Sequence, residues 1–244
     1  MKYLYSLGGG QQLIREIPVK HSATALVKGA LLIKGATDDT DEAFAKIWVA
    51  SGADIVGVLE EAAATTETDS NADGTAVLLK KVTLNPDAVY LCEYDQAAAS
   101  TPSPTSSSGT TYTHSSIEGI AGGWLYVAGG TGAGQLQWVV SDGSGSLVTK
   151  TAFDPVLDST SEVVKILPQF HALAELIANG SKFITQAAAG TLNVCILENF
   201  IEADNIPFQR LNPAKHSGLT GLNSQNVKFY SEVYFRDHLL NPLS

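Results

Sequence analysis

Residues 119–155 consist of three short apolar runs separated by glycine-dense turns, and this pattern constrains the fold more than any other feature of the chain. The runs at 123–128 and 135–141 contain the aromatic and β-branched residues that favour strands. Asp142-Gly143-Ser144-Gly145 is typical of the turn of a hairpin and leads into a third run at 147–153. The segment therefore predicts a β-meander.

The glycines at 129, 130, 132 and 134 are best explained by a hairpin between two of these runs. A phosphate-binding loop of this kind opens a helix, whereas Gln135-Leu136-Gln137-Trp138 continues as a strand. The Lys-Ser/Thr ending of a P-loop is missing too. Nucleotide binding is not expected.

The first third of the chain carries five further strand-like runs, separated by turn residues. They lie at 24–34, 44–50, 55–60, 76–84 and 88–94. Short strands at this spacing, without intervening helices, predict a small antiparallel barrel or sandwich over residues 23–96.

Two segments flank this unit. Residues 1–22 predict an extended N-terminal arm, because Gly8 to Gly10 interrupt any regular element; a frayed terminus or an edge strand on the chain's own core is the alternative. Residues 97–116 are rich in Ser, Thr and Pro and predict a linker or an exposed loop. The alternative for 97–116 is a large insertion in one continuous sheet.

Residues 117–201 predict a second β-rich region that contains one short helix at 168–179. Apolar residues recur there at helical spacing, with Pro168 in the first turn and Gly180 just after the end. Residues 202–244 predict an extended C-terminal tail whose final strand lies at 227–236. The fold class is thus mainly β: a barrel or sandwich, a second β region with one helix, an arm and a tail.

The charge pattern limits the partners of the protein. The net charge is −10, although only 16% of the residues are charged, against about 25% in ordinary domains. An acidic chain repels phosphate, so a nucleic-acid partner is disfavoured. Neither a signal peptide nor a membrane-spanning apolar window is seen, so we expect synthesis in the cytoplasm and no membrane partner. Cys92 and Cys195 lie in apolar runs and are expected to be buried free thiols.

A weak cation site is the one metal hypothesis that the sequence raises. Asp69, Asn71 and Asp73 repeat the first half of a calcium loop, but Lys80 occupies the position of the closing glutamate. A plain Asx-rich turn is the favoured explanation of the same residues, and a solvated loop is the favoured explanation of the acidic run at 38–42. No metal ligand is assigned.

No catalytic constellation emerges from the remaining residues. The five histidines show no metal-ligand spacing; they are His21, His114, His171, His216 and His238. The Gly-x-Ser-x-Gly elbow of a serine hydrolase is not present either. Trp48, Trp124 and Trp138 are either sugar-stacking platforms or core and interface anchors. We therefore expect a protein that is not an enzyme and that has no cofactor.

Several segments resemble capsid decoration (head-stabilising) proteins of tailed bacteriophages. Lys28–Leu32, Ile55–Glu61 and Ala76–Leu79 follow an order that is similar to the one in that family, where it folds as a small β-barrel. Residues 123–127, 130–135 and 158–162 are similar to a motif of phage virion structural proteins.

The resemblance implies a virion protein on the capsid surface. Such a protein would bind the major capsid protein from outside as a homo-oligomer, expected to be a trimer, and would stabilise the shell. It would have no catalytic residues. The alternative is a receptor- or glycan-binding module of a tail or fibre that uses the region from Trp124 to Trp138.

Overall fold

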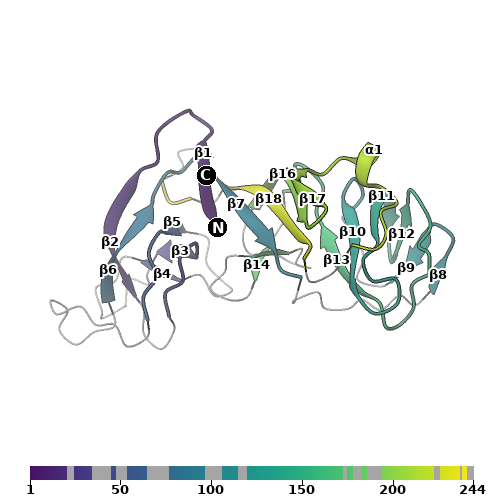
Figure 1. Cartoon of the computed structure of the whole chain (residues 1–244). Coiled ribbons are helices and arrows are strands. Elements are labelled where there is room, and N and C mark those ends of the chain that lie inside the picture. Colours follow the sequence, from purple (N-terminus) through teal and green to yellow (C-terminus); the bar gives the residue numbers. More distant parts are fainter. Residues whose placement is uncertain are drawn as a thin grey trace.

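The computed structural model describes residues 1–20, 25–34, 45–47, 54–64, 77–96, 106–114, 120–172, 175–177, 183–185, 194–222, 226–236 and 238–240. These residues form strands and one single-turn helix, α1 (Pro213–His216). The predicted mainly β fold is confirmed. Figure 1 shows a barrel at the left, a larger sheet in the middle and a third sheet at the right of an elongated molecule.

The barrel is closed by five strands in the order β2-β4-β3-β5-β6. Strand β6 alternates buried Leu78 and Val82 with exposed Leu79 and Lys81, as a strand with one buried face must. All its pairs are antiparallel except β2 with β4. The strands are β2 (Ile14–Lys20), β3 (Leu31–Lys34), β4 (Ala45–Ile47), β5 (Ile55–Leu59) and β6 (Val77–Thr83).

The middle sheet joins segments from both ends of the chain. Strand β18 lies between β7 and β16 and pairs antiparallel with both, while β1 pairs with β7. In order, the sheet contains β14 (Glu175–Ile177), β15 (Phe183–Thr185), β7 (Ala88–Tyr94), β18 (Lys228–Phe235), β16 (Val194–Ala203) and the edge strand β17 (Ile206–Arg210), with β1 (Lys2–Ser6) off this path.

The third sheet contains the predicted meander. Strands β10 and β11 form the glycine hairpin, and β12 follows the turn at 144–145. In order, its strands are β13 (Glu162–Ile166), β10 (Trp124–Gly129), β11 (Leu136–Gly143), β12 (Ser146–Thr149), β9 (Thr111–Thr113) and β8 (Ser106–Ser108).

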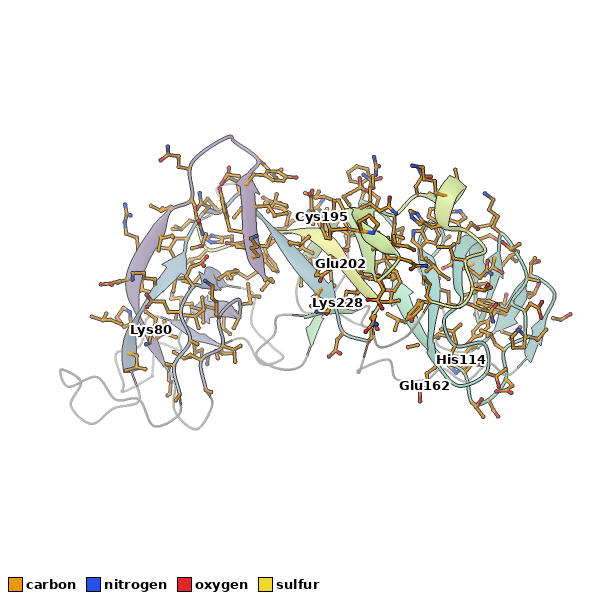
Figure 2. The ribbon with its side chains drawn as sticks, in the orientation of Figure 1. Lys80, His114, Glu162, Cys195, Glu202 and Lys228 are labelled. Carbon is orange, nitrogen blue, oxygen red and sulfur yellow. The ribbon has the colours of Figure 1, made fainter. Side chains whose placement is uncertain are left out.

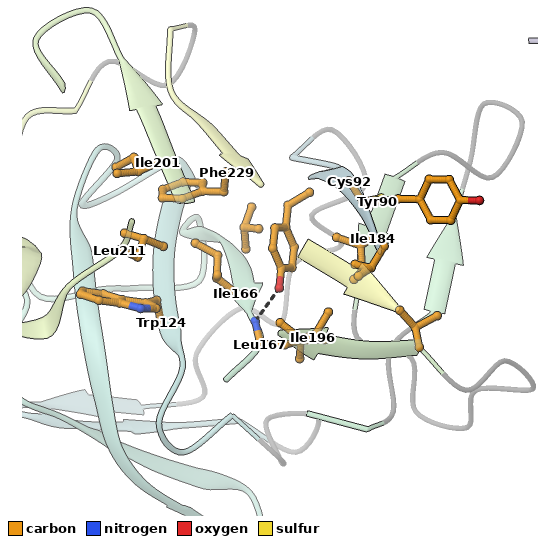
Figure 3. Close-up of a cluster of buried hydrophobic side chains, with 14 of the residues drawn as sticks. Tyr90, Cys92, Trp124, Ile166, Leu167, Ile184, Ile196, Ile201, Leu211 and Phe229 are labelled. Atoms are coloured by element: carbon orange, nitrogen blue, oxygen red, sulfur yellow. Dashed lines mark hydrogen bonds between the residues drawn. The ribbon is translucent and has the colours of Figure 1, made fainter. Parts of the chain in front are cut away.

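Three clusters of buried apolar side chains stabilise these sheets. The largest cluster extends from the barrel through the middle sheet to the third sheet: Leu31 belongs to the barrel, Phe229 to the middle sheet and Trp124 to the third sheet. Part of this cluster is drawn in Figure 3. A second cluster fills the barrel, and a third lies on the other face of β10, around Leu125 and Val127. Both faces of β10 are therefore buried, which explains its continuous apolar sequence.

A buried polar network links the middle sheet to the segment after β13. The Tyr94 hydroxyl accepts a hydrogen bond from the Leu167 amide at 3.1 Å, which is the dashed line in Figure 3. Asn199 Nδ2 donates to the Leu167 carbonyl at 2.7 Å, and Asn199 Oδ1 lies 2.5 Å from Ser231 Oγ and 3.3 Å from the Tyr94 hydroxyl. The network pairs buried groups of Tyr94, Asn199, Ser231 and Leu167 that would otherwise be costly to desolvate.

The predictions for the first part of the chain need correction. In the described part of the expected arm, 1–20, β1 pairs with β7, which agrees with the alternative of an edge strand on the chain's own core, and β2 closes the barrel against β6. Tyr3 packs edge-on against Tyr90 at 6.2 Å, so the segment has its own core contacts. The barrel therefore starts at Ile14 rather than at 23, and β7 belongs to the middle sheet.

The helix predicted at 168–179 is wrong. Phe170 has a φ of +61°, which a helix does not permit, and Glu175–Ile177 pairs with β15 as strand β14. The apolar spacing fits a helix, but Glu175–Ile177 forms a local hairpin with β15, and β15 in turn pairs with the distant strand β7, so sheet formation prevails over helix propensity. The helix that forms among the described residues is α1, where Asn212 caps the Ala214 amide and Pro213 takes the first position.

The expected linker and tail are also partly structured. Within 97–116, β8 and β9 form a hairpin that extends the third sheet. The expected tail, 202–244, supplies the end of β16, all of β17, α1 and β18, and β18 coincides with the strand predicted at 227–236. Because β18 pairs on both sides, this segment completes the middle sheet instead of extending from it.

Candidate binding surface

The middle sheet has a buried face and a half-exposed face. Along β18, Phe229, Ser231, Val233 and Phe235 are buried, and the residues between them are exposed or partly exposed. The half-exposed face carries aromatic and charged side chains on β1, β7, β16, β17 and β18 and in the turn between β16 and β17. We call this surface the aromatic face; it consists of Lys2, Tyr5, Glu93, Glu198, Phe200, Glu202, Asp204, Phe208, Arg210, Lys228, Tyr230 and Glu232.

Three rings form the centre of the aromatic face. Phe200 on β16 stands opposite Tyr230 on β18 in the strand register. The β16–β17 hairpin folds Phe208 back over Phe200, and the two rings stack with centroids 5.1 Å apart and planes at 6°. Phe208 also meets Tyr230 edge-on at 5.5 Å. Phe208 is 46% exposed, so its ring is held in place by neighbours without being covered.

The aromatic face carries five acidic residues and three basic residues, Lys2, Arg210 and Lys228, so carboxylates outnumber cations by two. Glu198 forms an ion pair with Arg210 at 2.7 Å, and Glu93 lies 3.7 Å from Lys228. Glu202 and Lys228 are register partners and appear close together in Figure 2. These exposed pairs contribute little to stability.

Three carboxylates of the aromatic face accept hydrogen bonds from neutral donors instead. Glu202 accepts from the Tyr230 hydroxyl at 3.1 Å, Glu232 accepts from the Tyr5 hydroxyl at 2.9 Å, and Asp204 accepts from Asn226. Burial, followed by the neighbouring carboxylates, raises the pKa of Tyr230 to about 12, and burial with the Glu232 contact raises the pKa of Tyr5. Both tyrosines therefore stay protonated donors at neutral pH.

A strained loop lies beside the aromatic face. Phe170 combines a positive φ with 68% exposure of its side chain. The Phe170 amide donates to the Ile196 carbonyl at 2.5 Å, and the Ile196 amide donates to the His171 carbonyl at 3.0 Å. The loop therefore pairs with β16 at Ile196, before the part of β16 that pairs with β17. Gln169 reaches Glu198 at 3.4 Å. A left-handed non-glycine residue costs about 1 kcal/mol or more, and the β16 contacts hold this one.

The structure overturns the idea that Trp124 is a sugar platform. Trp124 is 2% exposed, and its ring is covered edge-on by Trp138 at 5.1 Å and by His216 at 6.3 Å. It is a core anchor, as one of the two interpretations of the sequence held. Trp138 is partly buried against the same cluster, and Trp48 lies outside the described residues.

The interpretation of the glycine segment as a hairpin is confirmed. Gly130 has a φ of +72°, and a Cβ placed there would lie 1.8 Å from the Thr160 carbonyl oxygen, so only glycine fits. The turn at 158–161 closes on the hairpin. Asp158 accepts from Thr160 and from Thr131 Oγ1 at 2.8 Å, contacts that lower the pKa of its carboxyl.

The predicted cation site at Asp69, Asn71 and Asp73 lies outside the described residues, as does the acidic run at 38–42. Among the residues that the structure describes, no group of three or more His, Cys, Asp or Glu side chains is arranged to hold a metal ion. Cys92 and Cys195 are both buried free thiols, as predicted. Burial raises the pKa of the Cys92 thiol to about 12, which makes it a poor nucleophile.

The described histidines lie at different places in the fold and make different contacts. His216 is the buried last residue of α1; its ring accepts a hydrogen bond from the Asn212 amide at 2.9 Å, and burial lowers its pKa. His238 accepts from the Leu240 amide at 3.1 Å, while its Nε2 is buried without a partner. His114 and His171 are described at other places in the chain, and His21 is outside the described residues.

No protein-family model, curated protein or solved structure gives a significant match to this chain. Across the described ranges, none of the helical segments has the length and apolar character needed to cross a bilayer. The aromatic face was not predicted from the sequence, because Phe208 lies in a stretch with two prolines that gives no strand pattern.

Proposed function

We propose that this chain is a non-enzymatic structural protein of a phage virion. It binds the major capsid protein on the outer surface of the capsid as a homo-oligomer, a trimer, and so stabilises the shell. The observation that carries the proposal is the aromatic face, a fixed and partly exposed ring cluster on the middle sheet of a mainly β chain whose segments resemble capsid decoration proteins.

The segments that carry the resemblance occupy scaffold positions. Ile55–Leu59 is β5, Val77–Thr83 is β6, and Leu31–Lys34 is β3, so these segments contribute three of the five barrel strands. The 123–127 segment lies in β10, and 158–162 forms the turn that closes on the glycine hairpin. This placement supports a role in which a rigid frame presents a binding surface.

The stabilising mechanism is mass action. A protein that binds only the assembled shell lowers its free energy by RT ln(1 + [L]/Kd), about 2.7 kcal/mol at a hundredfold excess over Kd. Exposed aromatic residues that are already held by neighbours suit this task, because little side-chain entropy is lost on binding. The low density of charge on the chain also reduces the cost of desolvating its surface.

Cosedimentation tests the proposal. Purified chain is mixed with shells that lack it, and the pellet is quantified across a range of concentrations. We expect saturation at a fixed number of copies per shell. Light scattering should give the mass of three chains of 25.7 kDa for the free protein. A chain that stays in the supernatant at every concentration would refute capsid binding, and a monomer would refute the trimer.

A further inference from the structure

We infer that the aromatic face docks a segment of the partner protein that bears exposed arginine or lysine side chains. The identity of the partner rests on the proposed function, in which it is the capsid shell protein. The chemistry of the contact rests on the aromatic face itself.

The geometry of the rings leaves a position where a cation can bind over the open side of Phe208, and we call this position the ring seat. Phe200 and Phe208 are stacked face to face, which leaves the outer side of Phe208 open, in line with its 46% exposure. A guanidinium or ammonium group over such a ring gains about 0.5–1 kcal/mol at an exposed site and more when it is desolvated. The edge-on contact with Tyr230 fixes the Phe208 ring and keeps this seat preorganised.

The charges around the rings favour a cationic occupant. Glu202, Asp204 and Glu232 each accept a hydrogen bond from a neutral hydroxyl or amide donor, while Lys228, the register partner of Glu202, lies 3.7 Å from Glu93. The five carboxylates of the aromatic face therefore exceed its three cations by two negative charges. Glu202 contacts the same Tyr230 that packs on Phe208, which places an acceptor beside the ring seat. An arginine can stack on the ring and bind the carboxylate at once, whereas a neutral segment would offer the carboxylates no positive charge.

Other occupants fit these charges less well. A second copy of the chain carries the same net charge of −10, and two aromatic faces brought together would oppose carboxylate to carboxylate. A nucleic acid would place its phosphates against Glu202 and Asp204. The partner that complements the face is thus a basic protein surface.

Phe170 supplies an independent sign that this region makes contacts. A large apolar side chain is held 68% exposed on a left-handed backbone, next to the β16 edge and one residue from the Gln169 contact to Glu198. Strain of this kind is retained where the surrounding structure imposes it and is concentrated at functional sites. We expect Phe170 to extend the contact area at the edge of β16.

The probe is a tetra-arginine peptide titrated into the full chain, followed by amide NMR shifts. Phe208→Ala removes the ring without changing the charge, and Glu202→Gln removes one charge while keeping an acceptor for Tyr230. Val140→Ala is the matched control, because Val140 is 55% exposed on β11 of the third sheet. We expect shifts confined to β16, β17 and β18, with Kd raised about two- to fivefold by Phe208→Ala and unchanged by Val140→Ala.

The outcomes separate this inference from the proposed function. Shifts spread over the whole surface, or equal affinity of the Phe208→Ala and Val140→Ala variants, would overturn the inference even if the chain binds shells. If the chain ignores shells but the peptide shifts β16–β18 in a Phe208-dependent way, the proposed function fails and the inference stands. A Phe208→Ala variant that turns an oligomer into a monomer without weakening peptide binding would assign the face to a second copy and overturn the inference.

Discussion

Replacement of Tyr94 by Phe deletes one hydroxyl from the buried polar network and changes almost nothing else. That hydroxyl accepts from the Leu167 amide at 3.1 Å and lies 3.3 Å from Asn199 Oδ1. Asn199 keeps its contact with Ser231, but the Leu167 amide loses its acceptor in a fully buried position. An unsatisfied buried donor costs about 1–3 kcal/mol, so we expect a loss of about 2 kcal/mol in the free energy of unfolding.

Tyr126→Phe is the matched control for this substitution. Tyr126 belongs to the same hydrophobic cluster, but its hydroxyl is buried without a hydrogen-bond partner. Removing an unpaired polar atom spares its desolvation, so we expect the free energy of unfolding to stay within about 0.5 kcal/mol or to rise. The two variants remove the same atom from the same kind of residue and differ only in hydrogen bonding.

Thermal unfolding and urea unfolding of the three proteins measure the difference. For a chain of this size about 2 kcal/mol corresponds to a fall in Tm of roughly 4–8 °C, and the urea midpoint should fall without a change in slope. Equal midpoints for Tyr94→Phe and Tyr126→Phe would refute the view that the network stabilises the fold. A larger loss for Tyr126→Phe would refute it as well.

Three further predictions concern pH, the glycine hairpin and the thiols. Burial lowers the pKa of His238 to about 4, so the unfolded chain binds a proton at His238 more readily than the folded chain does, and stability should fall as the pH drops from about 6.5 to 4. His238→Gln should flatten this part of a profile of urea midpoint against pH. An unaltered profile would contradict the assignment of this pH dependence to His238. Gly130→Ala should cost at least about 2 kcal/mol, measured by Tm, because its Cβ would meet the Thr160 carbonyl; an unchanged Tm would show that the turn can relax. Cys92 should react with a thiol reagent only after unfolding, because it is fully buried and its pKa is raised to about 12; rapid labelling of the native protein at Cys92 would count against that burial.

About half of the strands that the structure describes could be predicted from the sequence, because each of these is a short apolar run bounded by turn residues. The alternation of apolar and polar residues at 227–236 identified β18 as a half-buried strand, and the glycines between 129 and 134 identified the β10–β11 hairpin. The sheets themselves could not be predicted, because pairing between β7 and β18 depends on contacts between residues more than a hundred positions apart. Local periodicity says which face of a strand is apolar but not which strand lies beside it.

The same limit explains why the aromatic face was missed. Phe208 follows Pro207, and a proline argues against a strand unless the strand lies at an edge, where its missing amide costs nothing. Strand β17 is such an edge. The positive φ of Phe170 was equally hidden, because a left-handed residue is expected to be glycine. The helix predicted over 168–179 failed because Glu175–Ile177 pairs with β15 in a hairpin that joins the sheet through the distant strand β7, and local apolar spacing does not reveal that sheet.

An electron cryo-microscopy reconstruction of capsid shells saturated with the chain tests the central claim most directly. Our account predicts added density on the outside of the shell, with the middle sheet oriented so that Phe208, Tyr230 and Glu202 face basic side chains of the shell protein. A reconstruction without added density, or one in which these three residues face solvent, would contradict it.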